Sequence, residues 1–218
     1  MIITIGGGSR PQTNFVWRNI LEKINKPSVL YVPYARKQAD YSVCLEYIYQ
    51  EIGMDNFSQL MMLQYKNEYI EDEFDEFNTM YIGGGSVPDL LDFIYTTKFD
   101  RVLRHWNNMD KVVIGSSAGA IIMGKDAKMY RDFPQGILFR KGLDFCGGIS
   151  FACHYKEKGV YKSLSALDVQ KKILNYINNN ISTVIALPED SAIIWNKNGR
   201  IEQVINSAYE FKKALVEG

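Results

Sequence analysis

The sequence predicts an α/β protein of three layers, in which a mainly parallel sheet is flanked by helices. Apolar runs of strand type alternate with helical patterns four times before residue 112, which favours parallel strands joined by right-handed crossovers. Three such runs end in glycine-rich turns, at Gly6, Gly83 and Gly115. In sheets of this kind, ligands bind at the carboxyl ends of the strands, so we expect the three turns to meet there.

The first half of the chain supplies the alternating elements, and several of them carry start or stop signals. Pro33 ends the pairing of its strand, Gly53 is a helix stop, and Pro88 suits the first turn of a helix. Segment 68–76 carries six carboxylates in nine residues, which is typical of a solvated helix face. We expect strands over 1–5, 28–35, 57–64 and 78–82 and a strand leading into Gly115, with helices over 15–24, 41–52, from 87 onward and over 99–107.

The second half of the chain has a different character. After Gly124, short β-type runs and glycines extend to Cys153 and predict hairpins and loops. No linker divides the sequence, so we expect one domain over residues 1–218. A small antiparallel β extension should complete the fold, because a polar loop over 156–165 is followed by a helical pattern at 167–177, a strand pattern at 183–187 and a hairpin pattern that pairs 191–195 with 201–205.

Composition argues against several classes of partner. Lysine plus arginine and aspartate plus glutamate each number 25, so the net charge is zero and we expect no nucleic-acid partner. No apolar run approaches membrane-spanning length and no signal peptide is recognised, so we expect a cytoplasmic protein without a membrane partner. Cys44, Cys146 and Cys153 lack the spacing of a zinc site and should be reduced thiols. We expect no metal, no cofactor, and a monomer or homodimer.

One motif carries the chemistry of the chain. A strand-type run meets the pattern Gly-x-Ser-x-Gly at Gly115-Ser116-Ser117-Ala118-Gly119 and continues into an apolar, helix-compatible segment. This is the sequence form of a nucleophile elbow, in which a strand turns sharply into a helix and the hydroxyl of Ser117 stands at the tip. The two glycines suit a strained turn that leaves no room for Cβ atoms. A plain tight turn is the alternative interpretation.

A serine nucleophile needs a general base, which is usually histidine. The chain has two histidines. His105 is expected mid-helix, with its helix ending at the opposite edge of the sheet, so it should be a surface or packing residue. His154 follows a β-type run and begins a loop, so it can reach the edge that carries Ser117. By elimination His154 is the candidate base. Cys153 precedes it, but neighbours on a strand point to opposite faces.

A third residue should be a carboxylate that orients His154 and stabilises its imidazolium form. Four acids are candidates, and the sequence alone does not choose among them: Asp132, Asp144, Glu189 and Asp190. Glu189 directly follows a buried-looking strand and Pro188, where a position at the sheet edge is expected. A carboxylate in such a loop is more often a simple turn residue.

The proposed chemistry also needs two backbone amides that bind the developing oxyanion. Ala118, next after the nucleophile, supplies one by the geometry of the elbow. Gly84 or Gly85 should supply the second, because a glycine backbone can approach a substrate closely. The turn Gly6–Gly8 matches neither Gly-x-Gly-x-x-Gly nor a Walker loop. Close backbone packing at the top of the sheet is therefore favoured there over nucleotide binding.

This set of motifs resembles the peptidase E family of serine peptidases, which includes aspartyl dipeptidases and cyanophycinases on a fold like that of class I glutamine amidotransferases. The resemblance spans roughly residues 2–205, and Gly-Ser-Ser-Ala-Gly-Ala is its most specific part. It implies that Ser117 is the nucleophile and His154 the base. Aspartyl dipeptidases use an acid that matches Asp132, and cyanophycinases use one that matches Glu189. The oxyanion donors of the family match Ala118 and the Gly84-Gly85 turn.

The chain departs from the family pattern at several positions. Ser86 stands where asparagine is common, and Cys153 stands where proline or a polar residue is common. Aspartyl dipeptidases hold the acidic substrate side chain with an arginine after the histidine, but no arginine lies between His154 and Arg200. Lys156 or Lys162 would be point charges in its place, without the bidentate fork.

Together these features predict a serine peptidase that hydrolyses short peptides. An esterase or amidase acting on another acyl substrate would use the same residues. A non-catalytic, amidotransferase-like domain that binds a ligand at the sheet edge is the alternative from another class, and it would leave Ser117 distant from His154 or unreactive.

Overall fold

The core of the protein is a seven-stranded sheet. A computed structural model describes residues 1–24, 26–37, 41–127, 141–155, 166–180 and 183–212. The first five strands of this sheet along the chain pair in parallel, and its last two strands add an antiparallel hairpin. The strands lie in the order β3 (Gln59–Met62), β2 (Ser28–Val32), β4 (Thr79–Ile82), β5 (Val112–Ser116), β1 (Ile2–Ile5), β8 (Ala192–Trp195) and β9 (Ile201–Ile205).

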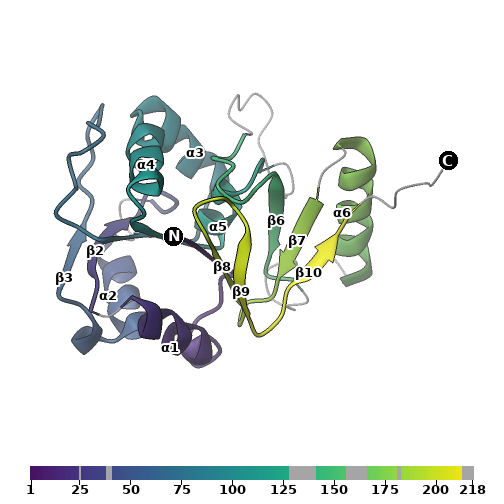
Figure 1. The fold of residues 1–218 in the computed structure, drawn as a ribbon, viewed down its shortest axis with the longest axis horizontal. Helices are drawn as coiled ribbons and strands as arrows, with labels where there is room; N and C mark the ends of the chain where they lie inside the picture. Colours follow the sequence, from purple (N-terminus) through teal and green to yellow (C-terminus); the bar gives the residue numbers. More distant parts are fainter. Residues whose placement is uncertain (25, 38–40, 128–140, 156–165, 181–182, 213–218) are drawn as a thin grey trace.

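Helices cover both faces of this sheet (Figure 1). The helices α1 (Asn14–Lys23) and α2 (Tyr41–Ile52) pack on one face with Ile114 of β5, whereas its neighbour Val113 faces the opposite layer. This alternation follows from the two-residue period of a strand. The predicted α/β fold with a mainly parallel sheet between helices is thereby confirmed. The opposite layer consists of α3 (Val87–Thr96), α4 (Phe99–Asn108) and α5 (Ala118–Met123).

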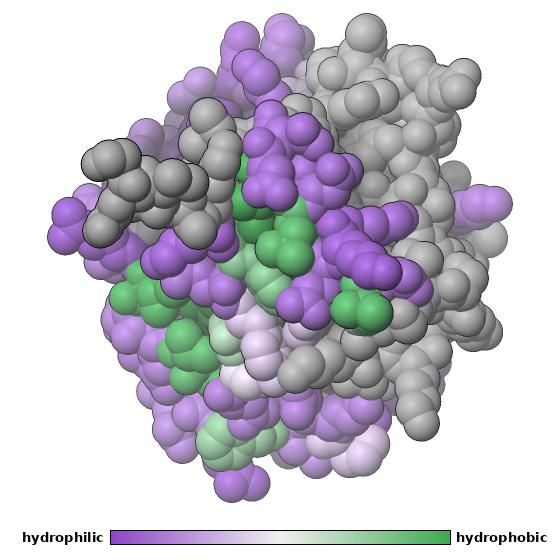
Figure 2. Space-filling model, turned by 90° about the vertical axis from the view of Figure 1, so that its right-hand side faces the viewer, coloured by the Kyte–Doolittle hydropathy of each residue, from purple (hydrophilic) through white to green (hydrophobic). Residues whose placement is uncertain are grey.

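A second sheet of three strands lies beside the first (Figure 1). Its strand β7 (Thr183–Leu187) pairs in parallel with β6 (Ile149–Cys153) and antiparallel with β10 (Tyr209–Phe211). One face joins the core of α3, α4 and α5, and the other packs against α6 (Ala166–Asn180). On the side that carries α6, the described residues are mostly hydrophilic, with hydrophobic ones in small groups (Figure 2).

The structure differs from the sequence-based expectations at one turn segment and three strands. Segment 68–76 has no regular structure at 68–70 and forms turns over 71–76 rather than a helix; its buried residues, Tyr69 and Phe74, are five positions apart, a spacing that does not fit one helix face. The strands β2 and β3 are shorter than expected. The three-residue strand β10 was not predicted, because so short a run has no resolvable period.

Among the described residues, no helix has both the length and the apolar character needed to cross a membrane.

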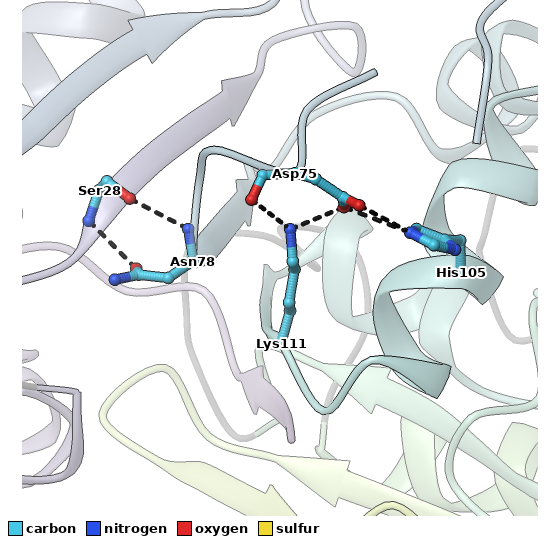
Figure 3. Close-up of polar contacts among 5 residues, drawn as sticks. All are labelled: Ser28, Asp75, Asn78, His105 and Lys111. Carbon is cyan, nitrogen blue, oxygen red and sulfur yellow. Dashed lines mark hydrogen bonds and ion pairs between the residues drawn. The ribbon is translucent and has the colours of Figure 1, made fainter. Parts of the chain in front are cut away.

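Two sets of polar contacts lie at the amino-end edge of the sheet (Figure 3). Lys111, just before β5, donates hydrogen bonds of 2.8 Å to the backbone and side-chain oxygens of Asp75, and Nε2 of His105 lies 3.2 Å from both carboxylate oxygens. The hydrogen bonds from Lys111 and His105 lower the pKa of Asp75. Ser28 and Asn78 link the starts of β2 and β4 by reciprocal hydrogen bonds. His105 therefore lies at the opposite edge of the sheet from Ser117.

Candidate active site

The turn around Ser117 has the strand–turn–helix geometry that its motif predicts. Strand β5 ends at Ser116, helix α5 begins at Ala118, and Ser117 lies between them with φ 52° and ψ −108°. Such a backbone conformation is costly for a residue with a side chain. The flanking glycines permit it by close packing: a Cβ on Gly115 would lie 2.4 Å from the carbonyl oxygen of Gly119, and one on Gly119 would lie 2.2 Å from that of Ile82.

Three side chains from distant parts of the chain form a continuous line of hydrogen bonds. The Oγ atom of Ser117 lies 2.7 Å from Nε2 of His154, and Nδ1 of His154 lies 2.7 Å from Oε1 of Glu189. Because a carboxylate can only accept, Nδ1 of a neutral His154 carries the hydrogen and Nε2 is free to accept the hydroxyl proton of Ser117. Both His154 and Glu189 are largely buried, at 16% and 17% side-chain exposure.

The second sheet explains why His154 and Glu189 meet. His154 directly follows β6, and Glu189 follows β7 after a single proline. These strands are parallel neighbours, with Cys153 paired to Leu187, so their carboxyl ends lie side by side. The amide of Tyr155 also donates to the carbonyl of Leu187 at 3.0 Å, which holds the loop after β6 against the end of β7.

The Gly6–Gly8 turn at the end of β1 connects all three members of the line. The carbonyl of Gly6 accepts a hydrogen bond from the amide of His154 at 3.2 Å, and the amide of Gly8 donates to the carbonyl of Glu189 at 3.1 Å. The amide of Ser117 donates to Ile5, just before this turn, at 3.0 Å. The turn therefore serves the close backbone packing that the sequence suggested.

Gly7 is a site residue that sequence reasoning did not single out. Its φ of 114° is unfavourable for any residue with a side chain. A Cβ at this position would lie 2.6 Å from Cε1 and 2.9 Å from Nε2 of His154, and 2.8 Å from Cβ of Ser117. The run of three glycines after a strand was the only signal in the sequence, and it did not show which side chains the turn approaches.

We expect the substitution Gly7→Ala to lower kcat/KM by at least about 10²-fold, because the added methyl group displaces His154 from Ser117 and small misplacements have effects of this size. The measurement is steady-state hydrolysis of a peptide substrate, with circular dichroism to verify folding. The matched control is Gly148→Ala, where φ is also positive, at 81°, but an added Cβ meets nothing within 4 Å. Equal losses of activity in both variants would contradict this explanation.

The second glycine turn lies on the other side of Ser117. A Cβ on Gly84 would be 3.0 Å from Cβ and 3.5 Å from Oγ of Ser117. A hydrogen bond fixes this turn against the segment after β2, because the amide of Ser86 donates to the carbonyl of Ala35 at 2.7 Å. Among the described residues, no acceptor is hydrogen-bonded to the amides of Gly84, Gly85 and Ala118.

Two of the other candidate acids, Asp144 and Asp190, form hydrogen bonds with groups other than His154. The carboxylate of Asp144 accepts the amide hydrogen of Gly148 at 2.8 Å, and that of Asp190 accepts the hydroxyl of Ser191 at 3.2 Å. Both are turn residues. Asp132 lies outside the described residues, as do Lys156 and Lys162.

Cys153 lies under the site without facing it. Its Sγ atom is 3.6 Å from the carbonyl oxygen of Ser117, and the side chain belongs to the core shared with α3 and α5. Burial raises the pKa of this thiol to about 12, so it stays protonated at neutral pH and is a poor nucleophile. Within the described ranges, no cluster of three or more His, Cys, Asp or Glu side chains could hold a metal ion.

The sheet topology and the serine–histidine–glutamate line at its carboxyl edge are features of a hydrolytic α/β enzyme. The chain belongs to peptidase family S51, whose model matches residues 2–204, and it is thus a peptidase. This finding confirms the resemblance inferred from the motifs. No curated protein matches the chain.

Two solved structures share the fold of this chain. One is a Listeria monocytogenes EGD-e protein whose assignment as a peptidase E is provisional; it is 15% identical, with a TM-score of 0.68 and 98% of each chain covered. The other is a peptidase from an acI-B1 Actinobacterium, 17% identical, with a TM-score of 0.64 and coverage of 98% of this chain and 87% of that chain.

Proposed function

We propose that the protein is a serine peptidase that hydrolyses short peptides, with Ser117 as nucleophile, His154 as general base and Glu189 as the acid that orients it. The observation that carries this proposal is the pair of 2.7 Å contacts that joins the three side chains. Membership of peptidase family S51 supports peptide-bond cleavage. The strained backbone of Ser117 also supports a functional role, since such conformations cluster at active sites.

The proposed reaction has two halves. Nε2 of His154 accepts the proton of Ser117, and Oγ of Ser117 bonds to the peptide carbonyl carbon. The proton then passes from His154 to the leaving amine as the C–N bond breaks, which leaves an acyl-serine. In the second half, His154 removes a proton from water, the hydroxide attacks the ester, and Ser117 recovers its hydrogen as the acid product leaves. Throughout, the carboxylate of Glu189 accepts a hydrogen bond from the N–H at Nδ1 of His154 and stabilises the imidazolium form.

In this proposal the negative oxygen of each tetrahedral intermediate is bound by the amide of Ala118 and by that of Gly84 or Gly85. Their geometry supports the assignment, because these amides flank Ser117 and have no hydrogen-bond acceptor among the described residues. Donors of this kind stabilise the charge that develops in the transition state, and removal of one costs roughly 10²- to 10³-fold in kcat.

The test is to label the folded protein with a fluorophosphonate, map the adduct by mass spectrometry, and screen a dipeptide library with the same sample. We expect an adduct on Ser117 and hydrolysis of a subset of dipeptides. An adduct without hydrolysis would retain the activated serine but exclude short peptides in favour of an ester or amide substrate. A folded protein that forms no adduct would contradict the nucleophile assignment and favour a binding domain.

A further inference from the structure

A cavity of about 320 Å³ lies beside the glycine turn that flanks Ser117. It is bounded by Gly84, whose Cβ position is 3.5 Å from Oγ of Ser117, and by the rings of Tyr31, Tyr47 and Tyr81. Its volume is at the lower end of the range of ligand pockets, roughly 300–1,000 Å³. The cavity therefore suits one residue of a peptide rather than a long chain.

Apart from Arg36, the described side chains that line the cavity are uncharged. Burial raises the pKa of Tyr31, Tyr47 and Tyr81, so all three phenols keep their protons at neutral pH. The hydroxyl of Tyr47 donates to the carbonyl of Gly8 at 3.0 Å, which fixes its ring between the cavity and the Gly6–Gly8 turn. Such walls favour an apolar or aromatic side chain.

Arg36 is the only charged side chain among the described residues that line the cavity. Its Nε donates a 2.9 Å hydrogen bond to the carbonyl oxygen of Gly84, which anchors the guanidinium beside the glycine turn. Among the described residues, no carboxylate forms an ion pair with Arg36 and no acceptor is hydrogen-bonded to its two terminal nitrogens. A planar guanidinium held at one nitrogen is well suited to bind a carboxylate.

We propose that Arg36 binds the C-terminal carboxylate of the substrate, and that the side chain of this C-terminal residue lies among the three tyrosine rings. This inference rests on the proposed function. A C-terminal residue supplies both a carboxylate and an apolar side chain at one position, which matches the cation and the aromatic walls. An acidic side chain would supply the carboxylate but would leave the rings uncovered.

The consequence is selectivity for peptide length. Gly84 contacts both Arg36, through its carbonyl oxygen, and Ser117, so a carboxylate bound at Arg36 places the end of the peptide close to the cleaved bond. In a peptide with further residues after this position, no terminal carboxylate would lie at Arg36, and the additional residues would have to extend out of the cavity. The enzyme should therefore release the last residue or two of short peptides.

The kinetic test compares the best dipeptide from the library with its C-terminal amide. We expect the free acid to be favoured in kcat/KM by roughly tenfold to hundredfold, the range for a hydrogen bond to a charged group. The variant Arg36→Gln should lose this preference. Because Arg36 also holds Gly84, its loss is expected to lower hydrolysis of both substrates, so the acid-to-amide ratio is the readout. Lys37→Gln, a change of one charge on an exposed neighbour, should keep the ratio.

A binding test separates failure of this inference from failure of the proposed function, because it needs no catalysis. Calorimetry on the Ser117→Ala variant would compare Gly-Phe with Gly-Phe amide, and we expect tighter binding of the acid by the same tenfold to hundredfold factor, lost on adding Arg36→Gln. Equal binding of acid and amide would overturn the inference. So would a preference that follows aspartate over asparagine side chains whatever the state of the C-terminus.

Discussion

Replacing Ser117 with alanine is expected to lower kcat by about 10⁶-fold, the size of effect seen when a serine nucleophile is removed. Among the described residues, the hydroxyl of Ser117 is the only nucleophilic group that contacts Nε2 of His154, at 2.7 Å. The backbone of the turn should be unchanged, because alanine keeps the Cβ atom that packs against Gly84. Steady-state assays with the best library dipeptide provide the measurement.

The neighbouring serine is a matched control for this experiment. Ser116 is buried at the end of β5, where its side chain lies near that of Tyr81. We expect Ser116→Ala to retain activity within about tenfold, since it removes a neutral hydroxyl and leaves both described side-chain contacts of His154 in place. It should also be labelled on Ser117 by the fluorophosphonate. Substantial turnover by Ser117→Ala would remove the nucleophile from the proposal.

The substitution Glu189→Gln is expected to lower kcat by about 10⁴-fold, as when the acid of a serine–histidine pair is replaced by its amide. The glutamine amide can donate to Nδ1 of His154, which shifts the imidazole hydrogen to Nε2. Nε2 can then no longer accept the proton of Ser117. The side chain keeps its size, so the loss should fall on kcat more than on KM, which the assay resolves.

Two further variants decide which carboxylate acts. Asp190→Asn alters the adjacent acid, whose carboxylate accepts the hydroxyl of Ser191 rather than contacting His154, and activity should stay within a few-fold. Asp132→Asn tests the acid that matches aspartyl dipeptidases and should also keep most of its activity. A large loss in Asp132→Asn together with a small one in Glu189→Gln would transfer the orienting role to Asp132.

The fold class and the strand–turn–helix form of the Ser117 turn could be predicted from local patterns in the sequence. Strand and helix periods are local properties of the chain, and the Gly-x-Ser-x-Gly motif constrains a turn of only five residues. The segments 2–5 and 41–52 were therefore predicted close to their observed limits. His154 was singled out because the chain has only two histidines and the helix of His105 leads to the far edge of the sheet.

Tertiary structure alone decided which groups meet across long separations in the chain. The parallel pairing of β6 with β7 sets Glu189, rather than Asp144 or Asp190, against His154. The approach of Gly7 to the same histidine, and of Arg36 to Gly84, likewise depends on strand order. Sequence patterns record which residues are buried or exposed along one element, but contacts between the ends of different strands depend on register and packing across the whole sheet.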